Sequence, residues 1–196
     1  MLEEDGFIKI LSIDQARNGA WAVFDYDSKE LIAYGSFSFS YRNYTYAKAI
    51  LAIEELIDTV IKNYQVSAVF IEDIQLRINV QSFKKLAQLQ GVLINLFEKN
   101  EYLYDFIAPT QWQNYCRARG RSEKEIKGKI KALEASGKKE SKILSIQAVK
   151  DFYGVETEND NLADAILIGH YAVNHYVLEC RKDESLSLHR KASENK

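Results

Sequence analysis

The sequence predicts an α/β protein built on a mixed five-stranded sheet that is flanked by helices. Apolar stretches separated by turn residues occupy residues 8–39, which is typical of three antiparallel strands. Two later apolar stretches each follow a helical pattern, which is typical of parallel strands joined by crossover helices. The length of 196 residues and the hydrophobic content of 46% suit a single domain with a full core.

Turn residues separate the first strands, and apolar residues at helical spacing mark the helices. The predicted strands lie at residues 8–13, 21–24, 31–39, 66–71 and 103–108. Asn18 and Gly19 provide the first turn, and apolar positions alternate with serines in the third strand. The predicted helices lie at residues 46–64, 79–99, 111–117, 122–135, 140–152 and 165–180.

Charge is distributed unevenly along the chain, although the formal net charge is only -2. Residues 112–150 carry a net charge of +7, whereas the remainder carries -9. A basic segment on an acidic body favours a nucleic-acid partner that is contacted through phosphates. No apolar stretch reaches membrane length, so we expect a cytoplasmic protein without membrane contact. Residues 1–181 are predicted to form one domain, and residues 182–196 a polar, disordered tail.

Acidic residues stand at the ends of two predicted strands and at the start of the last helix. These residues are Asp14, Glu72, Asp160 and Asp164. A carboxylate is costly to bury alone, so each position needs a cation or a structural reason. The structural alternatives are a turn residue for Asp14, an N-cap for Asp160 and a helix-dipole contact for Asp164. Carboxylates held on rigid elements suit hard cations such as Mg²⁺.

The order of the elements, with acids after the first and fourth strands and on the last helix, resembles the ribonuclease H-like fold. More narrowly, the chain resembles the RuvC-type Holliday-junction resolvases, and its last block suits the phage-type members. The motifs that carry the resemblance are Leu11-Ser12-Ile13-Asp14, the series Glu72, Asn79, Ser82, Leu86 and Gly91, and Asn161-Leu162-Ala163-Asp164-Ala165. The chain departs from the family at Gln15-Ala16, which replace Pro-Gly, at Gln75, which replaces an aromatic wedge, and at Gln113, which replaces a lysine.

The resemblance implies a metal-dependent endonuclease domain that resolves four-way DNA junctions by paired hydrolysis of phosphodiester bonds. It implies two Mg²⁺ ions per site, which Mn²⁺ can replace, with Asp14 bridging both ions. The implied ligands and catalytic residues are Asp14, Glu72, Asp164 and Asp160, with Asn161 as the alternative for the last position. The candidate DNA-binding residues are Lys142, Lys139, Arg117, Arg119 and Arg121. For Lys142, a solvated residue of the first helical turn is the alternative.

A homodimer is expected, because a four-way junction has two-fold symmetry and needs two opposed cuts. The predicted interface is the helix at residues 79–99, and the alternative is that this helix is buried within its own monomer. The apolar residues that suggest the interface are Phe83, Leu86, Leu89, Leu93, Leu96 and Phe97. Two other functions stay open: another ribonuclease H-like nuclease acting on RNA or simpler branched DNA, and a nucleic-acid-binding module without catalysis.

Overall fold

The mixed five-stranded sheet that the sequence predicts forms the centre of the molecule, and its strands lie in the order β3-β2-β1-β4-β5. The computed structural model describes residues 8–40, 42–75, 79–118, 140–180 and 186–191. The antiparallel strands are β1 (Lys9–Asp14), β2 (Asn18–Asp25) and β3 (Leu31–Ser38). The parallel strands are β4 (Ala68–Glu72), which pairs with β1, and β5 (Leu103–Ile107), which pairs with β4.

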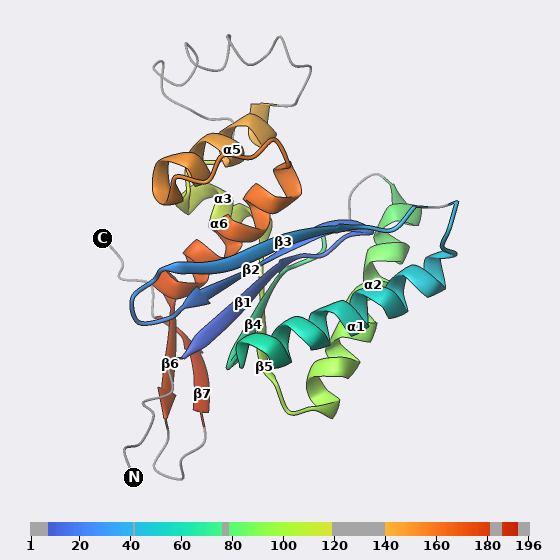
Figure 1. The fold of residues 1–196 in the computed structure, drawn as a ribbon, viewed down its shortest axis with the longest axis horizontal. Coiled ribbons are helices and arrows are strands. Elements are labelled where there is room, and N and C mark those ends of the chain that lie inside the picture. Colours follow the sequence, from blue (N-terminus) through green and yellow to red (C-terminus); the bar gives the residue numbers. More distant parts are fainter. Residues whose placement is uncertain (1–7, 41, 76–78, 119–139, 181–185, 192–196) are drawn as a thin grey trace.

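Helices cover both faces of the sheet (Figure 1). The first face carries α1 (Tyr46–Tyr64) and α2 (Val80–Lys99). On the second face α6 (Asp160–His175) packs against β1 and β2, beside α3 (Pro109–Tyr115) and α5 (Glu140–Tyr153). Successive strand residues point to opposite faces, so Ile10 joins the core under α6 and Leu11 joins the core under α1 and α2.

The close docking of α6 on the sheet depends on two small residues. A Cβ atom at Gly169 would lie 2.2 Å from the ring of Phe24, so only glycine allows this approach. The buried Ser12 hydroxyl of β1 donates to the carbonyl oxygen of Ala165 over 2.7 Å. These contacts fix where the first two turns of α6, which include Asp164, lie relative to the end of β1.

The end of the chain differs from the prediction. The last helix ends at His175, and β6 (Tyr176–Cys180) pairs with β7 (Leu186–Arg190) in a separate two-stranded sheet. The expectation of disorder is therefore wrong for residues 186–190. The Tyr176 ring packs 4.6 Å from that of Phe70, and its carbonyl accepts from the Tyr26 hydroxyl over 3.0 Å, so distant residues stabilise the strand.

The α2 helix uses most of its apolar residues inside the monomer. Leu89, Leu93, Leu96 and Phe97 are buried in the core between α2 and the sheet. Phe83 and Leu86 are only half-buried. The apolar surplus that suggested an interface is therefore mostly explained by the monomer's own core. None of the described helices is long and apolar enough to cross a membrane.

Candidate active site

Two of the predicted acids lie at the same edge of the sheet and face the same helix. Asp14 ends β1 and Glu72 ends β4, and Ile13 pairs with Ile71 one residue earlier in each strand. Because strand side chains alternate, these acids point to the α6 side, whereas Ile13 and Ile71 point to the core under α1 and α2. Adjacent parallel strands therefore bring Asp14 and Glu72 together, as expected for one site.

The third acid reaches this edge from the first turns of α6. The Asn159 side chain caps the helix by accepting from the backbone N–H groups of Asn161 and Leu162. The helix therefore begins at Asp160, and Asp164 follows one turn later. Ser145 of α5 donates a hydrogen bond to the Asp164 carboxylate. The Asp164 Oδ1 atom is buried and has no hydrogen-bond partner in the described part of the chain.

The three acids lie close enough to affect one another's ionisation. Burial, followed by repulsion from Glu72 and Asp164, holds the pKa of Asp14 well above its usual value. Burial and repulsion from Glu72 raise the pKa of Asp164 to about 7, although the Ser145 hydrogen bond and Lys142 act in the opposite direction. The site thus accumulates negative charge that the nearby Lys142 offsets only in part.

The fourth candidate ligand, Asp160, is paired with a cation of the protein. Its carboxylate forms an ion pair with the Lys142 ammonium of α5. The Asn161 amide instead donates to the carbonyl oxygen of Asn18 over 2.9 Å, which ties the start of α6 to the start of β2. Of the two residues considered for the fourth position, Asn161 therefore has a structural contact, and Asp160 has a charged partner beside the acids.

The chemistry of these residues suits a divalent metal ion. Among the described residues, no group of three His, Cys, Asp or Glu side chains is arranged to hold a metal ion as the side chains stand. Glu72 and Asp164 repel Asp14, and Lys142 engages Asp160 beside them. The donor set consists of carboxylate oxygens, which hard divalent cations prefer. The partnerless Asp164 Oδ1 is an atom that such a cation would satisfy.

A cavity of about 380 Å³ opens beside Asp14 and Glu72. Its other lining residues include Gln15, Asp73, Gln75, Asn79, Phe83 and Leu86. The Gln75 side chain is exposed there, at the position where the resemblance places an aromatic wedge. The cavity therefore joins Asp14 and Glu72 to the start of α2.

The predicted DNA-binding residues are only partly visible. Arg119, Arg121 and Lys139 lie outside the described residues. Arg117 is exposed just beyond α3, with a positive φ of 56°. Lys142 contacts Asp160 at the edge of the acidic cluster, so it is more than a solvated residue of the first helical turn.

Three further residues contact the acids without having been predicted from the sequence. Trp112 donates from Nε1 to Glu72 Oε1 over 3.0 Å, and Gln15 donates from Nε2 to the backbone carbonyl of Glu72 over 2.9 Å. Ser145 donates to Asp164. Only Ser145 had a signal in the sequence, because it follows Lys142 by three residues and shares its helix face.

Sequence comparison identifies relatives of this chain. Residues 10–134 match the family model described as crossover junction endodeoxyribonuclease RuvC. The RuvC of Sulfurovum sp. (strain NBC37-1) is 28% identical over 156 residues, which cover 73% of this chain and 98% of that protein. The RuvC of Wolinella succinogenes is 30% identical over 143 residues, which cover 65% of this chain and 86% of that protein. The family match includes Asp14 and Glu72 and ends before α6.

Structural comparison agrees with these relatives. A structure of Thermus thermophilus RuvC has a TM-score of 0.63 at 14% identity and covers 84% of this chain and 93% of its own. T. thermophilus RuvC in complex with Holliday junction substrate has a TM-score of 0.61 at 13% identity, covering 84% and 92%. These likenesses confirm the predicted fold class. Because the family match spans more than half of the sequence, this chain belongs to the RuvC family of crossover junction endodeoxyribonucleases.

Proposed function

We propose that this chain resolves four-way DNA junctions by metal-dependent hydrolysis of phosphodiester bonds, with Asp14, Glu72 and Asp164 as metal ligands. The observation that carries the proposal is the meeting of three carboxylates from β1, β4 and α6 at one partly buried edge. Clustered carboxylates that raise one another's pKa are unfavourable without a cation. Their arrangement therefore supports a site for added positive charge, and family membership supports the junction as substrate.

Mg²⁺ is the proposed ion, at two ions per site, and Mn²⁺ is expected to replace it. When bound, the ions stabilise the negative charge that grows on the attacking and leaving oxygens during in-line displacement. Asp14 would hold the ions together with Glu72 and Asp164, because both of these carboxylates lie close enough to repel its negative charge. Asp160 is the proposed fourth ligand, which requires its ion pair with Lys142 to open.

The basic segment is proposed to hold the DNA through its phosphates. Lys142 is a candidate contact, because its ammonium lies at the edge of the acidic site where a cleaved strand would pass. Arg117 is exposed after α3, and Arg119, Arg121 and Lys139 belong to the same basic stretch of the sequence. Junction affinity should fall with salt, by about 0.9 in the log-log slope for each phosphate neutralised.

A homodimer is the proposed assembly, because two opposed cuts in a symmetric junction require two sites. The buried residues of α2 are not available for its interface. Light scattering at micromolar concentration should give twice the mass of the 22.5 kDa chain. A strict monomer that nicks one strand per binding event would contradict the dimer, while leaving the nuclease assignment intact.

Cleavage of a labelled mobile four-way junction tests the proposal, with flap, linear duplex and RNA substrates alongside. We expect paired nicks in the junction that require Mg²⁺ or Mn²⁺. Preferential cutting of RNA or flaps would move the chain to another nuclease activity of this fold. Tight junction binding without cutting by the wild-type protein under any divalent ion would mean that the chain is a binding module.

Three single substitutions test the ligands. Asp14→Asn, Glu72→Gln and Asp164→Asn should each abolish cleavage and keep junction affinity within a few-fold, because phosphate contacts supply most of that affinity. Asp27→Asn is the matched control, since Asp27 is exposed in the turn between β2 and β3. Undiminished cutting by any of the first three would contradict the ligand assignment for that residue.

A further inference from the structure

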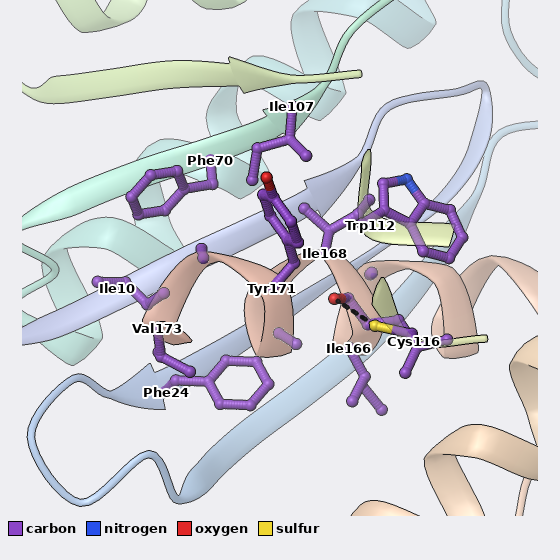
Figure 2. Close-up of a cluster of buried hydrophobic side chains, with 14 of the residues drawn as sticks. Ile10, Phe24, Phe70, Ile107, Trp112, Cys116, Ile166, Ile168, Tyr171 and Val173 are labelled. Carbon is purple, nitrogen blue, oxygen red and sulfur yellow. Dashed lines mark hydrogen bonds between the residues drawn. The ribbon is translucent and has the colours of Figure 1, made fainter. Parts of the chain in front are cut away.

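The Trp112 side chain joins the protein core to a proposed metal ligand. Trp112 is completely buried and belongs to the core cluster beneath α6, which includes Ile107 and Ile168 (Figure 2). Its Nε1 atom donates a hydrogen bond of 3.0 Å to Oε1 of Glu72. The indole therefore has its apolar ring in the core and its single polar atom on a carboxylate of the site.

The acceptor of the Trp112 N–H group indicates that this contact does more than pack the core. A buried tryptophan needs an acceptor for its N–H group, and a backbone carbonyl or another neutral group would be sufficient. Here the acceptor is a carboxylate, and hydrogen bonds to a charged acceptor are stronger and more directional than neutral ones. The ring itself is fixed by the surrounding core, so it can hold Glu72 Oε1 in one place.

Glu72 needs such a restraint because of its neighbours. Asp14 lies close enough for the two carboxylates to repel each other, and a glutamate side chain has several rotatable bonds. Repulsion favours rotamers in which Glu72 turns away from Asp14. The N–H group of Trp112 opposes this, while Gln15 Nε2 donates to the backbone carbonyl of the same residue over 2.9 Å.

We propose that Trp112 is a positioning residue for the reaction: its indole N–H fixes the Glu72 carboxylate in the orientation that receives the divalent ion. This inference rests on the proposed role of Glu72 as a ligand. Partners that orient metal ligands typically change metal affinity or activity by about 10- to 100-fold when they are removed. Loss of the N–H alone should therefore raise the Mg²⁺ concentration for half-maximal cleavage by a factor in that range.

The test removes the N–H and keeps the ring. Replacement of Trp112 by 3-benzothienylalanine puts sulfur in place of the N–H group at nearly the same shape, and Trp112→Phe is the simpler variant. Both should leave junction binding unchanged. The benzothienyl variant should stay folded with at most a small drop in Tm, and its cleavage should recover at saturating Mg²⁺. The same replacement at Trp21, which packs 6.0 Å from the Tyr64 ring, is the matched control and should change none of these values.

A spectroscopic measurement provides a second readout that does not depend on cleavage. The two tryptophans give two indole N–H signals in an NMR spectrum. The chemical shift of the Trp112 signal should differ between the wild type and Glu72→Gln. It should also change when the wild-type protein is titrated with Mg²⁺, whereas the shift of the Trp21 signal should stay constant in both experiments. A Trp112 signal whose chemical shift does not change with Mg²⁺ would overturn the inference.

The outcomes separate this inference from the proposed function. If Glu72→Gln abolishes cleavage and the benzothienyl variant keeps the wild-type Mg²⁺ dependence, Trp112 is only a core residue and the inference is overturned. If Glu72→Gln cleaves normally, the ligand assignment itself fails, whatever the Trp112 variants do. A raised Mg²⁺ requirement that disappears at saturating Mg²⁺ supports positioning, because a purely structural contact would lower cleavage at every Mg²⁺ concentration.

Discussion

Ionisation of Asp164 is the event whose energy follows most directly from the structure. Burial and repulsion from Glu72 raise the pKa of Asp164 from 3.8 to about 7 in the folded protein. The unfolded chain exposes this group, so there it titrates near 3.8. The folded state therefore favours the protonated acid. Asp164 therefore contributes fully to stability at a pH below its pKa in the unfolded chain. This contribution is lost as the pH rises through its pKa in the folded protein.

The size of the effect follows from the difference between the two pKa values. A difference of about three pH units corresponds to about 4 kcal/mol in the free energy of unfolding, at about 1.4 kcal/mol per unit. This is a large part of the roughly 5–15 kcal/mol that stabilises a typical domain. Asn has nearly the same shape as Asp and does not ionise, so Asp164→Asn should remove this part of the pH dependence.

Urea unfolding, followed by circular dichroism from about pH 4 to pH 8 in a chelator, measures the effect. Wild-type protein should lose about 4 kcal/mol more stability over this interval than Asp164→Asn, while the exposed-site control Asp27→Asn should parallel the wild type. Mg²⁺ added at high pH should return stability to the wild type, because it binds the folded state. Parallel curves for wild type and Asp164→Asn would refute the reasoning.

Two further predictions concern how the site is held. Gly169→Ala should lower the free energy of unfolding by about 1–3 kcal/mol and reduce cleavage, because the added methyl group would meet the Phe24 ring. The control is Gly91→Ala, which should leave stability unchanged or raise it, because Gly91 faces open space. Urea unfolding measures both variants. Lys142→Gln should tighten Mg²⁺ binding, because it removes a cation that competes for the acids. It should also slow cleavage, because it removes a proposed phosphate contact. Calorimetry measures the Mg²⁺ affinity, and weaker binding would contradict this prediction.

The positions of Asp14 and Glu72 could be predicted because they depend on local periodicity. Side chains along a strand alternate between the two faces of the sheet, and neighbouring parallel strands end at the same edge. An acid that follows each apolar stretch therefore lies at the same edge of the sheet as the other. The place of β4 beside β1 followed from the meander and the crossover helix. Asp164 could be placed near them only through the family resemblance, because periodicity does not say which strand a helix will contact.

The end of the last helix could not be predicted for a physical reason. Residues 176–180 continue an apolar pattern that is compatible with a helix. In the structure the chain becomes extended at Tyr176, where the Tyr26 hydroxyl and the Phe70 ring supply contacts from remote parts of the sequence. Tertiary contacts of this kind override local propensity, and a single sequence gives no spacing that reveals them.

The contacts of Trp112 and Gln15 are also tertiary contacts between distant residues, and they help to hold the acids of the proposed active site. Asp14 and Asp164 are buried beside like charges, which opposes folding, and the rest of the molecule has to hold them there. Ser12 and Gly169 dock α6 against the sheet, Ser145 donates to Asp164, and Trp112 and Gln15 restrain Glu72. Each restraint acts against electrostatic repulsion, so a divalent cation that removes the repulsion should stabilise the fold and complete the site in the same event.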